Sequence, residues 1–417
     1  MNPKIIPIVR FFGLFLLIAG ISYFLFDRLI PARKPLISIN LTSKTTPTPT
    51  TSKKTGVLNF EGPKTETCPL TGELYTKAEK DLWSIKRPLT VVIENHADSR
   101  PQSGLQNADI VYEAVAEGGI TRFLAVYYCA AQKGAPNRYD VGPVRSARTY
   151  FLDLAAEYSD YPLYTHVGGA NCSAATPGGP CTTNRKAQAI EQIASYGWNN
   201  KGTWSDLSQF SLSYKVCRRE PERTGEVRDT EHTMYCSTAE LWQTAASRGL
   251  TNITEINKSS WDKNFRSWNF KQKDESVSPV VANTISFDFW PGYQDYAVTW
   301  TYNSSANNYL RQNGGKNLID FNDDQTLSAK NLIIQFVKES RSIDEHGHNL
   351  YEVVGSGSGI LFQNGNKLDI TWSKLGRTSR TVFKNASGKE INFVPGNVWI
   401  EILPKNNTIS YENPKQS

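Results

Sequence analysis

Apolar runs of strand length alternate with helical patterns through residues 68–250. The strands expected from these runs are 89–93, 109–115, 120–128 and 162–167. Helical spacing of apolar residues follows Gly142-Pro143 and recurs over 186–196 and 238–248, and a proline such as Pro143 suits the first position of a helix. The alternation of the two patterns predicts an α+β or α/β domain over residues 68–250.

From about residue 280 the pattern changes to short strands separated by turns rich in Asn, Gly, Asp and Ser. The strands expected here are 284–289, 297–302, 331–337, 351–354, 359–363, 368–372 and 397–403. Turns such as Asn364-Gly365 suit hairpins. Residues 280–404 are therefore predicted to form a mainly β domain. A polar connection over 251–279 precedes it, and a polar tail over 405–417 follows it.

The N-terminal arm is predicted to anchor the chain in a membrane. Residues 5–26 are 22 residues with Arg10 as their only charge, and a helix of this length spans the ~30 Å core of a bilayer. A cleaved signal peptide is the alternative, but no small-residue cleavage site follows the run. We expect a single-pass transmembrane helix with flanks over residues 1–34, and a stalk rich in Thr, Pro and Lys over 35–67.

The formal net charge of +6 belongs to this arm. Residues 1–56 hold eight basic residues and one acidic residue, whereas the other 361 residues hold 38 basic and 39 acidic residues. A near-neutral body lacks the positive field that binding to a phosphate backbone requires. We therefore expect the membrane to be a partner, through residues 5–26, and nucleic acid not to be one.

Six cysteines lie downstream of the apolar run, and none has the C-x-x-C spacing of zinc ribbons or thioredoxins. Cys172 and Cys181 flank a loop of Gly and Pro that a disulfide could close, and Cys217 and Cys236 are a plausible second pair. Small buried thiols of a cytosolic protein are the alternative. Together with the anchor and stalk, paired cysteines favour a body on the extracytoplasmic side.

The densest polar cluster, IENHADSRPQSG, follows the strand 89–93. Glu94 could act as an acid or base and His96 titrates near neutrality, while Asn95 and Arg100 could orient a polar or anionic ligand. The same string could equally be a turn-forming loop with no further role.

Glu113 and Glu117 flank the next turn together with Arg122. On one continuous strand the two glutamates share a face about 13 Å apart. That separation is too large for the ~5 Å carboxylate pair of a retaining glycosidase, unless a bend brings the two closer. A solvated strand edge explains them equally well.

The segment GPVRSAR could bind an anion. If a helix begins at Pro143, its free N–H groups attract negative charge, and Arg145 and Arg148 lie on one helix face. Alternatively, the two arginines pair with Glu157, Glu113 or Glu117 in a structural network. His166, before Gly168-Gly169, and His232 are further candidates, although a lone histidine is more often structural.

Two patterns in the second half are expected to be misleading. His346 and His348 lack an evident third ligand pair, so no metal site is predicted. The glycine-rich stretch 355–359 has no following Lys-Ser/Thr and is expected to be a turn between strands.

The motifs RPLTVVIENHADSRPQSGLQNADIVYEAVAEGGITRF, VGPVRSARTYF and THVGGA resemble the YerB-like family of bacterial envelope proteins, as do DDQTLSAKNLIIQF and YEVVGSGSGILFQNGNKLDITWSK in the second half. The resemblance covers about residues 68–404. It implies a mixed N-terminal domain, a β C-terminal domain and an extracytoplasmic location. It implies no reaction, because these are domains of unknown function. Unlike family members that are lipoproteins, this sequence has no cysteine before Cys68.

The expected function is binding of an anionic envelope component, such as a wall polymer or an envelope protein, by the N-terminal domain. An envelope hydrolase using Glu94 or His96 as general acid/base is one alternative, and a non-catalytic scaffold is another. Convergence of Glu94, His96, Arg145 and His166 would favour the hydrolase. No cofactor is expected. The candidate ligand-binding residues are Glu94, Asn95, His96, Arg100, Glu113, Glu117, Arg122, Arg145, Ser146, Arg148 and His166.

Overall fold

The computed structural model describes residues 60–133, 139–272 and 282–412. The predicted membrane helix over 5–26 and most of the predicted stalk lie outside these ranges. Within these ranges, no helix has both the length and the apolar character needed to cross a membrane.

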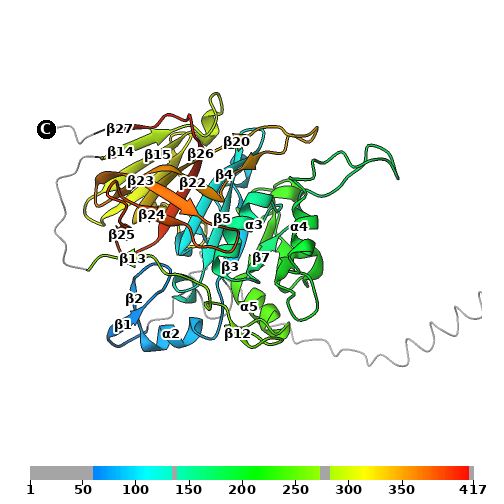
Figure 1. The fold of residues 1–417 in the computed structure, drawn as a ribbon, viewed down its shortest axis with the longest axis horizontal. Coiled ribbons are helices and arrows are strands. Elements are labelled where there is room, and N and C mark those ends of the chain that lie inside the picture. Colours follow the sequence, from blue (N-terminus) through cyan, green and yellow to red (C-terminus); the bar gives the residue numbers. More distant parts are fainter. Residues whose placement is uncertain (1–59, 134–138, 273–281, 413–417) are drawn as a thin grey trace, which may run out of the picture. The chain divides into compact units, whose positions relative to one another are not determined.

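A ten-stranded sheet runs through the molecule in the order β24-β23-β22-β19-β26-β4-β5-β3-β7-β8 (Figure 1). From the first half of the chain come β3 (Leu89–Glu94), β4 (Ile110–Glu117), β5 (Ile120–Tyr127), β7 (Leu163–His166) and β8 (Asp206–Ser208). From the second half come β19 (Asn331–Val337), β22 (Gly355–Gln363), β23 (Asn366–Lys374), β24 (Val382–Lys384) and β26 (Val398–Pro404). Because β26 pairs in parallel with β4, the two halves share one sheet.

The central strands are buried on both faces, which explains why their sequences are apolar without interruption. All six residues of β3 are buried, as are all but one residue of β4 and of β5. Phe123 of β5 packs edge-on against Trp399 of β26, at 5.5 Å between ring centroids. The predicted strands 89–93, 109–115 and 120–128 are thus present within a residue or two of their predicted ends.

A smaller sheet covers one face of the large one. Its strands are β17 (Lys316–Asn317), β16 (Asn308–Asn313), β15 (Val298–Asn303), β14 (Thr284–Phe287) and β27 (Ser410–Glu412), with β18 (Ser328–Ala329) paired to β16. Burial alternates along β15 and β16, as expected for strands with one face in the core. Trp300 of β15 contacts Trp399, at 5.2 Å between centroids. Residues 410–412 lie in the predicted polar tail and form an edge strand.

The opposite face of the large sheet is covered by α3 and the turn that follows it. Tyr112 of β4 shares a 2.8 Å hydrogen bond with Tyr158, just after α3. The α-helices of the described residues are short: α2 (Lys77–Trp83), α3 (Thr149–Ala155), α4 (Ala189–Ser195) and α5 (Thr238–Ser247). The protein is therefore mostly β with few helices, which corrects the balance expected for the first half.

The predicted helix start at Pro143 is wrong. Residues 142–148 form no helix, and three of their main-chain N–H groups donate to distant segments: Val144 to Met234, Arg145 to Val92 and Ala147 to Gly168. These N–H groups are engaged, so the proposed anion site at a helix start does not exist. Helix α3 begins only at Thr149.

Short strands and turns complete the fold. The strands are β1 (Lys64–Thr67), β2 (Leu74–Thr76), β6 (Asp140–Val141), β9 (Cys217–Arg219), β10 (Met234–Ser237), β11 (Ile253–Thr254), β12 (Ser259–Ser260), β13 (Asn269–Phe270), β20 (Glu339–Ser340), β21 (Leu350–Tyr351) and β25 (Asn392–Phe393). Strand β1 lies at the end of the predicted stalk and pairs with β2. Strand β13 lies in the predicted connection and pairs with β25.

All six cysteines of the sequence are paired. The pairs are Cys68–Cys129, Cys172–Cys181 and Cys217–Cys236. The two pairings considered from the sequence are both present. The third joins the segment between β1 and β2 to the residues after β5 and had no local signal, because its partners are 61 residues apart.

Candidate functional site

The predicted site residues divide between the two faces of the ten-stranded sheet. Glu94 of β3 stands opposite Arg122 of β5 and faces the α3 side. Its neighbour Asn95 turns the other way, where its Nδ2 donates to Thr121 at 2.8 Å and to Glu113 at 3.2 Å. Because successive residues of a strand point to opposite faces, these two sets cannot form one site.

Glu113 and Glu117 lie on opposite faces, contrary to the prediction for a regular strand. The register of β4 against β5 shifts between Val115 and Glu117. Glu113 accepts a hydrogen bond from Thr121 at 2.6 Å, whereas Glu117 pairs with Arg122 at 3.0 Å. A bulge of this kind reverses the alternation of side chains. The two glutamates therefore do not act as a catalytic pair.

On the α3 side, Glu94 lies between an arginine and a histidine. Its Oε1 is 3.1 Å from Nε of Arg145, and its Oε2 is 2.9 Å from Nδ1 of His232. The ring of His232 stacks on the ring of His96, with centroids 4.7 Å apart and planes 13° apart. His232 had no sequence signal linking it to this cluster, because it lies 138 residues from Glu94.

Arg122 and Arg148 share the carboxylate of Glu117. Arg122 also donates to the main-chain oxygen of Ser146, at 3.2 Å. Burial acts to raise the pKa of Glu117, but the charges of Arg122 and Arg148 outweigh it and lower the pKa to about 2.

Arg145 and Arg148 bind different carboxylates, so the predicted clamp on one helix face is wrong. The pairing of Arg148 with Glu117 matches the structural alternative.

On the other face, Asn95, Arg100 and Glu113 belong to an interior network. Arg100 donates to Oδ1 of Asn95 at 3.1 Å. Glu113 pairs at 2.6 Å with Arg311, which also pairs at 2.5 Å with Glu401, and these three side chains are fully buried. Burial raises the pKa of Glu401 to about 8. These predicted ligand residues therefore connect the two halves of the protein.

An open pocket borders this network. Arg100 reaches its edge, with Nη1 donating to the main-chain oxygen of Asp295 at 2.9 Å. Among its lining residues are Ala97, Asn313, Lys316 and Asn317. Of the interior network, Arg100 is thus the member that meets solvent.

The buried side chain of His166 contacts other residues than Glu94, His96 and Arg145 do. Its Nε2 is 2.8 Å from Asp206, and its Nδ1 contacts the main-chain oxygen of Gly168. The convergence that would favour a hydrolase is therefore incomplete: three of the four residues gather around His232, and His166 bonds elsewhere.

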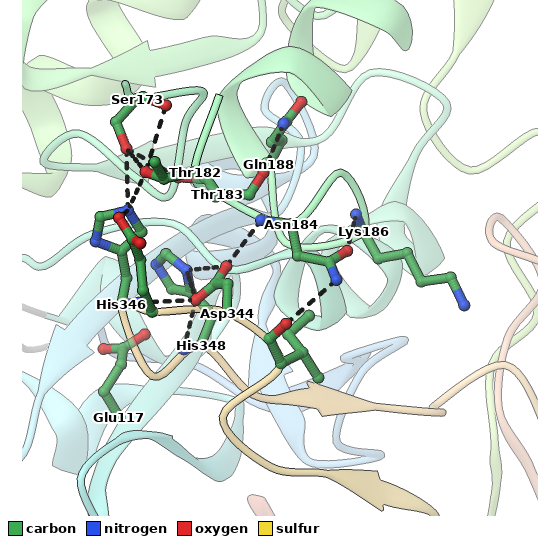
Figure 2. Close-up of polar contacts among 12 residues, drawn as sticks. Glu117, Ser173, Thr182, Thr183, Asn184, Lys186, Gln188, Asp344, His346 and His348 are labelled. Carbon is green, nitrogen blue, oxygen red and sulfur yellow. Dashed lines mark hydrogen bonds and ion pairs between the residues drawn. The ribbon is translucent and has the colours of Figure 1, made fainter. Parts of the chain in front are cut away.

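A further polar cluster joins the loop closed by Cys172–Cys181 to the second half of the chain (Figure 2). Nε2 of His346 is 3.0 Å from Ser173 Oγ and 2.9 Å from Thr182 Oγ1. Nδ1 of His348 is 2.8 Å from Asp344, which also accepts a 2.9 Å bond from the main chain of Asn184. The two histidines thus bind different partners, and the contacts of His346 and Asp344 join one loop to the other.

Comparison with known proteins identifies the family. A model described as the N-terminal domain of a protein of unknown function (DUF3048) matches residues 70–251, and the corresponding C-terminal model matches residues 285–400. The chain belongs to the DUF3048 family. Its two family domains contribute strands to the one ten-stranded sheet.

A curated relative and a solved structure agree with this assignment. "Putative lipoprotein YerB" of Bacillus subtilis (strain 168) is 31% identical over 339 residues, which are 81% of this chain and 86% of the relative. The crystal structure of the YerB protein from Bacillus subtilis matches with a TM-score of 0.61 and 27% identity, covering 83% of this chain and all of that one. The resemblance to YerB-like proteins found in the sequence is confirmed.

Proposed function

We propose that this DUF3048 chain is a single-pass membrane protein of the bacterial envelope, whose extracytoplasmic body binds an anionic envelope component. The location rests on the pairing of all six cysteines. Disulfides persist in oxidising compartments and are rare in the cytosol. The Bacillus subtilis relative carries "lipoprotein" in its name, which agrees with attachment to a membrane. In this chain the attachment would be residues 5–26.

A cluster of three arginines on the α3 side supports the binding of an anion. Arg122, Arg145 and Arg148 lie there with the carboxylates of Glu94 and Glu117, and Asp98 adds a third carboxylate beside His96. Arg145 is the most exposed of the three arginines, with 27% of its side chain accessible. Guanidinium groups bind phosphate and carboxylate through charge-assisted hydrogen bonds. A wall polymer carrying such groups suits this surface.

The geometry gives less support to an envelope hydrolase. A general acid must reach the atom that it protonates. Both oxygens of Glu94 are engaged, one by Arg145 and one by His232, and its side chain is 4% exposed. We therefore favour binding without catalysis.

The location is tested with spheroplasts of bacteria that make the full-length chain. Added protease should degrade the body without lysis, and the chain should stay in the membrane pellet after an alkaline wash. A body that is protected until the spheroplasts are lysed would contradict the proposed side of the membrane. Release of the intact chain by the wash would contradict the anchor.

Binding is tested by retention of the full-length chain, purified in detergent, on wall material. R145Q should reduce retention severalfold at moderate salt. R185Q is the matched control, because it removes the same charge from an exposed position outside the cluster. Failure of the wild type to be retained would contradict the binding function. Equal retention of R145Q and the wild type would contradict the proposed surface.

A further inference from the structure

We infer that His96, Asp98 and His232 form a binding site for a divalent transition-metal ion, with Glu94 holding the innermost ligand in position. One ring nitrogen of each histidine and one carboxylate oxygen of Asp98 lie within 4.8 Å of one another. Imidazole and carboxylate together are common ligands of Zn²⁺ and Fe²⁺. The sequence did not predict this site, since His232 is distant from the other two residues along the chain.

Glu94 fixes both the tautomer and the direction of the His232 ring. Oε2 of Glu94 is 2.9 Å from Nδ1 of His232, and the two side chains are 4% and 8% exposed. A carboxylate accepts hydrogen bonds, so Nδ1 carries the proton, and the lone pair on Nε2 is left for a metal ion. Metal-binding histidines generally use their second ring nitrogen in this way.

The other two ligands lie on the turn that follows β3. Nδ1 of His96 is 3.5 Å from Oδ2 of Asp98. An ion with bonds of ~2.1 Å places neighbouring ligand atoms about 3.0–3.4 Å apart, which is close to this separation. Nδ1 of His96 also accepts a 3.3 Å hydrogen bond from the main-chain N–H of Asp98, and its ring lies parallel to that of His232, so the His96 ring must turn away from both contacts to bind an ion. The side chains of His96 and Asp98 are 30% and 76% exposed and can rotate towards the fixed ring of His232.

The main chain of this turn is held by Arg228. Its Nη2 donates to the main-chain oxygen of Arg100 at 2.6 Å, and its Nη1 donates to that of Asp98. The guanidinium is thus occupied by two carbonyl groups and sets the path of the segment that carries His96 and Asp98. A rigid turn lowers the entropic cost of bringing the ligands together.

One other group of potential ligands has the required proximity among the described residues: Cys68, Asp109 and Cys129. Its two sulfur atoms are joined in a disulfide and supply no thiolate. At the histidine site, three protein ligands would leave coordination positions for water or for an oxygen of an anionic ligand. The inference stands without the proposed anion binding, because it rests on the ligand geometry alone.

The site is tested with the full-length chain, free of histidine tags, purified in detergent and stripped with EDTA. Calorimetry should show one Zn²⁺ bound per chain, and Co²⁺ should give visible d–d absorption from the same site. Mg²⁺ at the same concentration should give no binding, because hard cations prefer oxygen ligands. Absence of stoichiometric Zn²⁺ and Co²⁺ binding would overturn the inference.

Variants locate the ion. H96Q and D98N alter exposed ligands without disturbing the core, and each should weaken Zn²⁺ binding tenfold or more. E94Q changes the residue that positions His232 and should weaken binding by about 10–100-fold, as expected for a partner of a metal ligand. H346Q removes a histidine of the second polar cluster and should leave the affinity within twofold. Wild-type affinity in H96Q and D98N, or an equal loss in H346Q, would show that the ion binds elsewhere.

Retention on wall material by the EDTA-treated wild type separates the two proposals. Metal binding without retention would leave the metal site standing and remove the anion function. Retention without metal binding would support the anion function and overturn the metal site.

Discussion

The guanidinium of Arg311 lies 2.6 Å from the carboxylate of Glu113, with both side chains fully buried. Arg311 belongs to β16 of the smaller sheet, and Glu113 belongs to β4 of the larger one. Glu401 of β26 is the register neighbour of Glu113 and binds the same arginine. A single cation thus holds two acidic side chains on adjacent strands, one from each half of the chain.

Replacing Arg311 by Met should lower the free energy of unfolding by about 3–5 kcal/mol, because it leaves the buried side chains of Glu113 and Glu401 without their partner. Urea unfolding of R311M followed by tryptophan fluorescence measures the change. R266M is the control: Arg266 pairs with Glu390 but is 64% exposed, so its loss should cost less than about 1 kcal/mol. Equal effects of the two substitutions would contradict a structural role for the buried cluster.

Glu401 should make the protein less stable as the pH rises from about 4.5 to about 8. Burial raises its pKa from 4.5 to about 8, so over this range the folded chain keeps a proton that the unfolded chain releases. Below pH 4.5 the group is protonated in both states and contributes no slope. E401Q mimics the protonated form. The free energy of unfolding of E401Q minus that of the wild type should therefore increase with pH over this range, by at most about 1.4 kcal/mol per pH unit.

Unfolding of the wild type and E401Q is therefore compared at several pH values. The difference between them, not the slope of either alone, carries the prediction, because burial also raises the pKa of Asp109 to about 7 and of Asp320 to about 6. Parallel curves from pH 4.5 to pH 8 would show that Glu401 ionises normally.

Gly142 should tolerate alanine poorly. Its φ is +150°, and a Cβ there would lie 2.6 Å from the main-chain oxygen of Met234. G142A should destabilise the chain by about 2–3 kcal/mol and should displace Arg145, since Val144 donates to that same oxygen. Gly118 is the matched control: its φ is +56° and a Cβ would meet nothing within 4 Å. G118A should lower the free energy of unfolding by about 1 kcal/mol. Thermal unfolding of both variants measures the two losses. Comparable losses would contradict the close approach of Met234.

The Cys68–Cys129 bond should stabilise the protein more than the Cys172–Cys181 bond. Their sequence separations are 61 and 9 residues, so the first restricts the unfolded chain more. The chain-entropy model gives about 4 kcal/mol for the first and less than about 3 kcal/mol for the second. Denaturant unfolding of the double alanine variants of each pair tests the order, and a reversed order would contradict it.

Much of the fold could be predicted because its central strands are buried on both faces and have uninterrupted apolar sequences. The start of α3 could not, because the N–H groups of Val144 and Arg145 are satisfied by Met234 and Val92, which lie far away in the sequence. Local spacing carries no information about such partners.

The candidate site could be predicted only in part, because local spacing again carries no information about distant partners. Residues near Glu94 and Arg145 could be recognised as polar segments at strand ends. The opposite directions of Glu113 and Glu117 depend on a bulge, and the role of His232 depends on a contact across 138 residues. Both are products of tertiary structure.

The position of β26 sets a condition on the order of folding. This strand comes from residues 398–404, yet it lies between β19 and β4 in the middle of the large sheet. Strand β4 therefore cannot pair along this edge until a strand almost 300 residues later in the sequence is available. Contacts between such distant segments form slowly. In an exported chain this edge of β4 would stay unpaired until nearly all of the residues have crossed the membrane, and an unpaired strand edge is prone to pair with other chains.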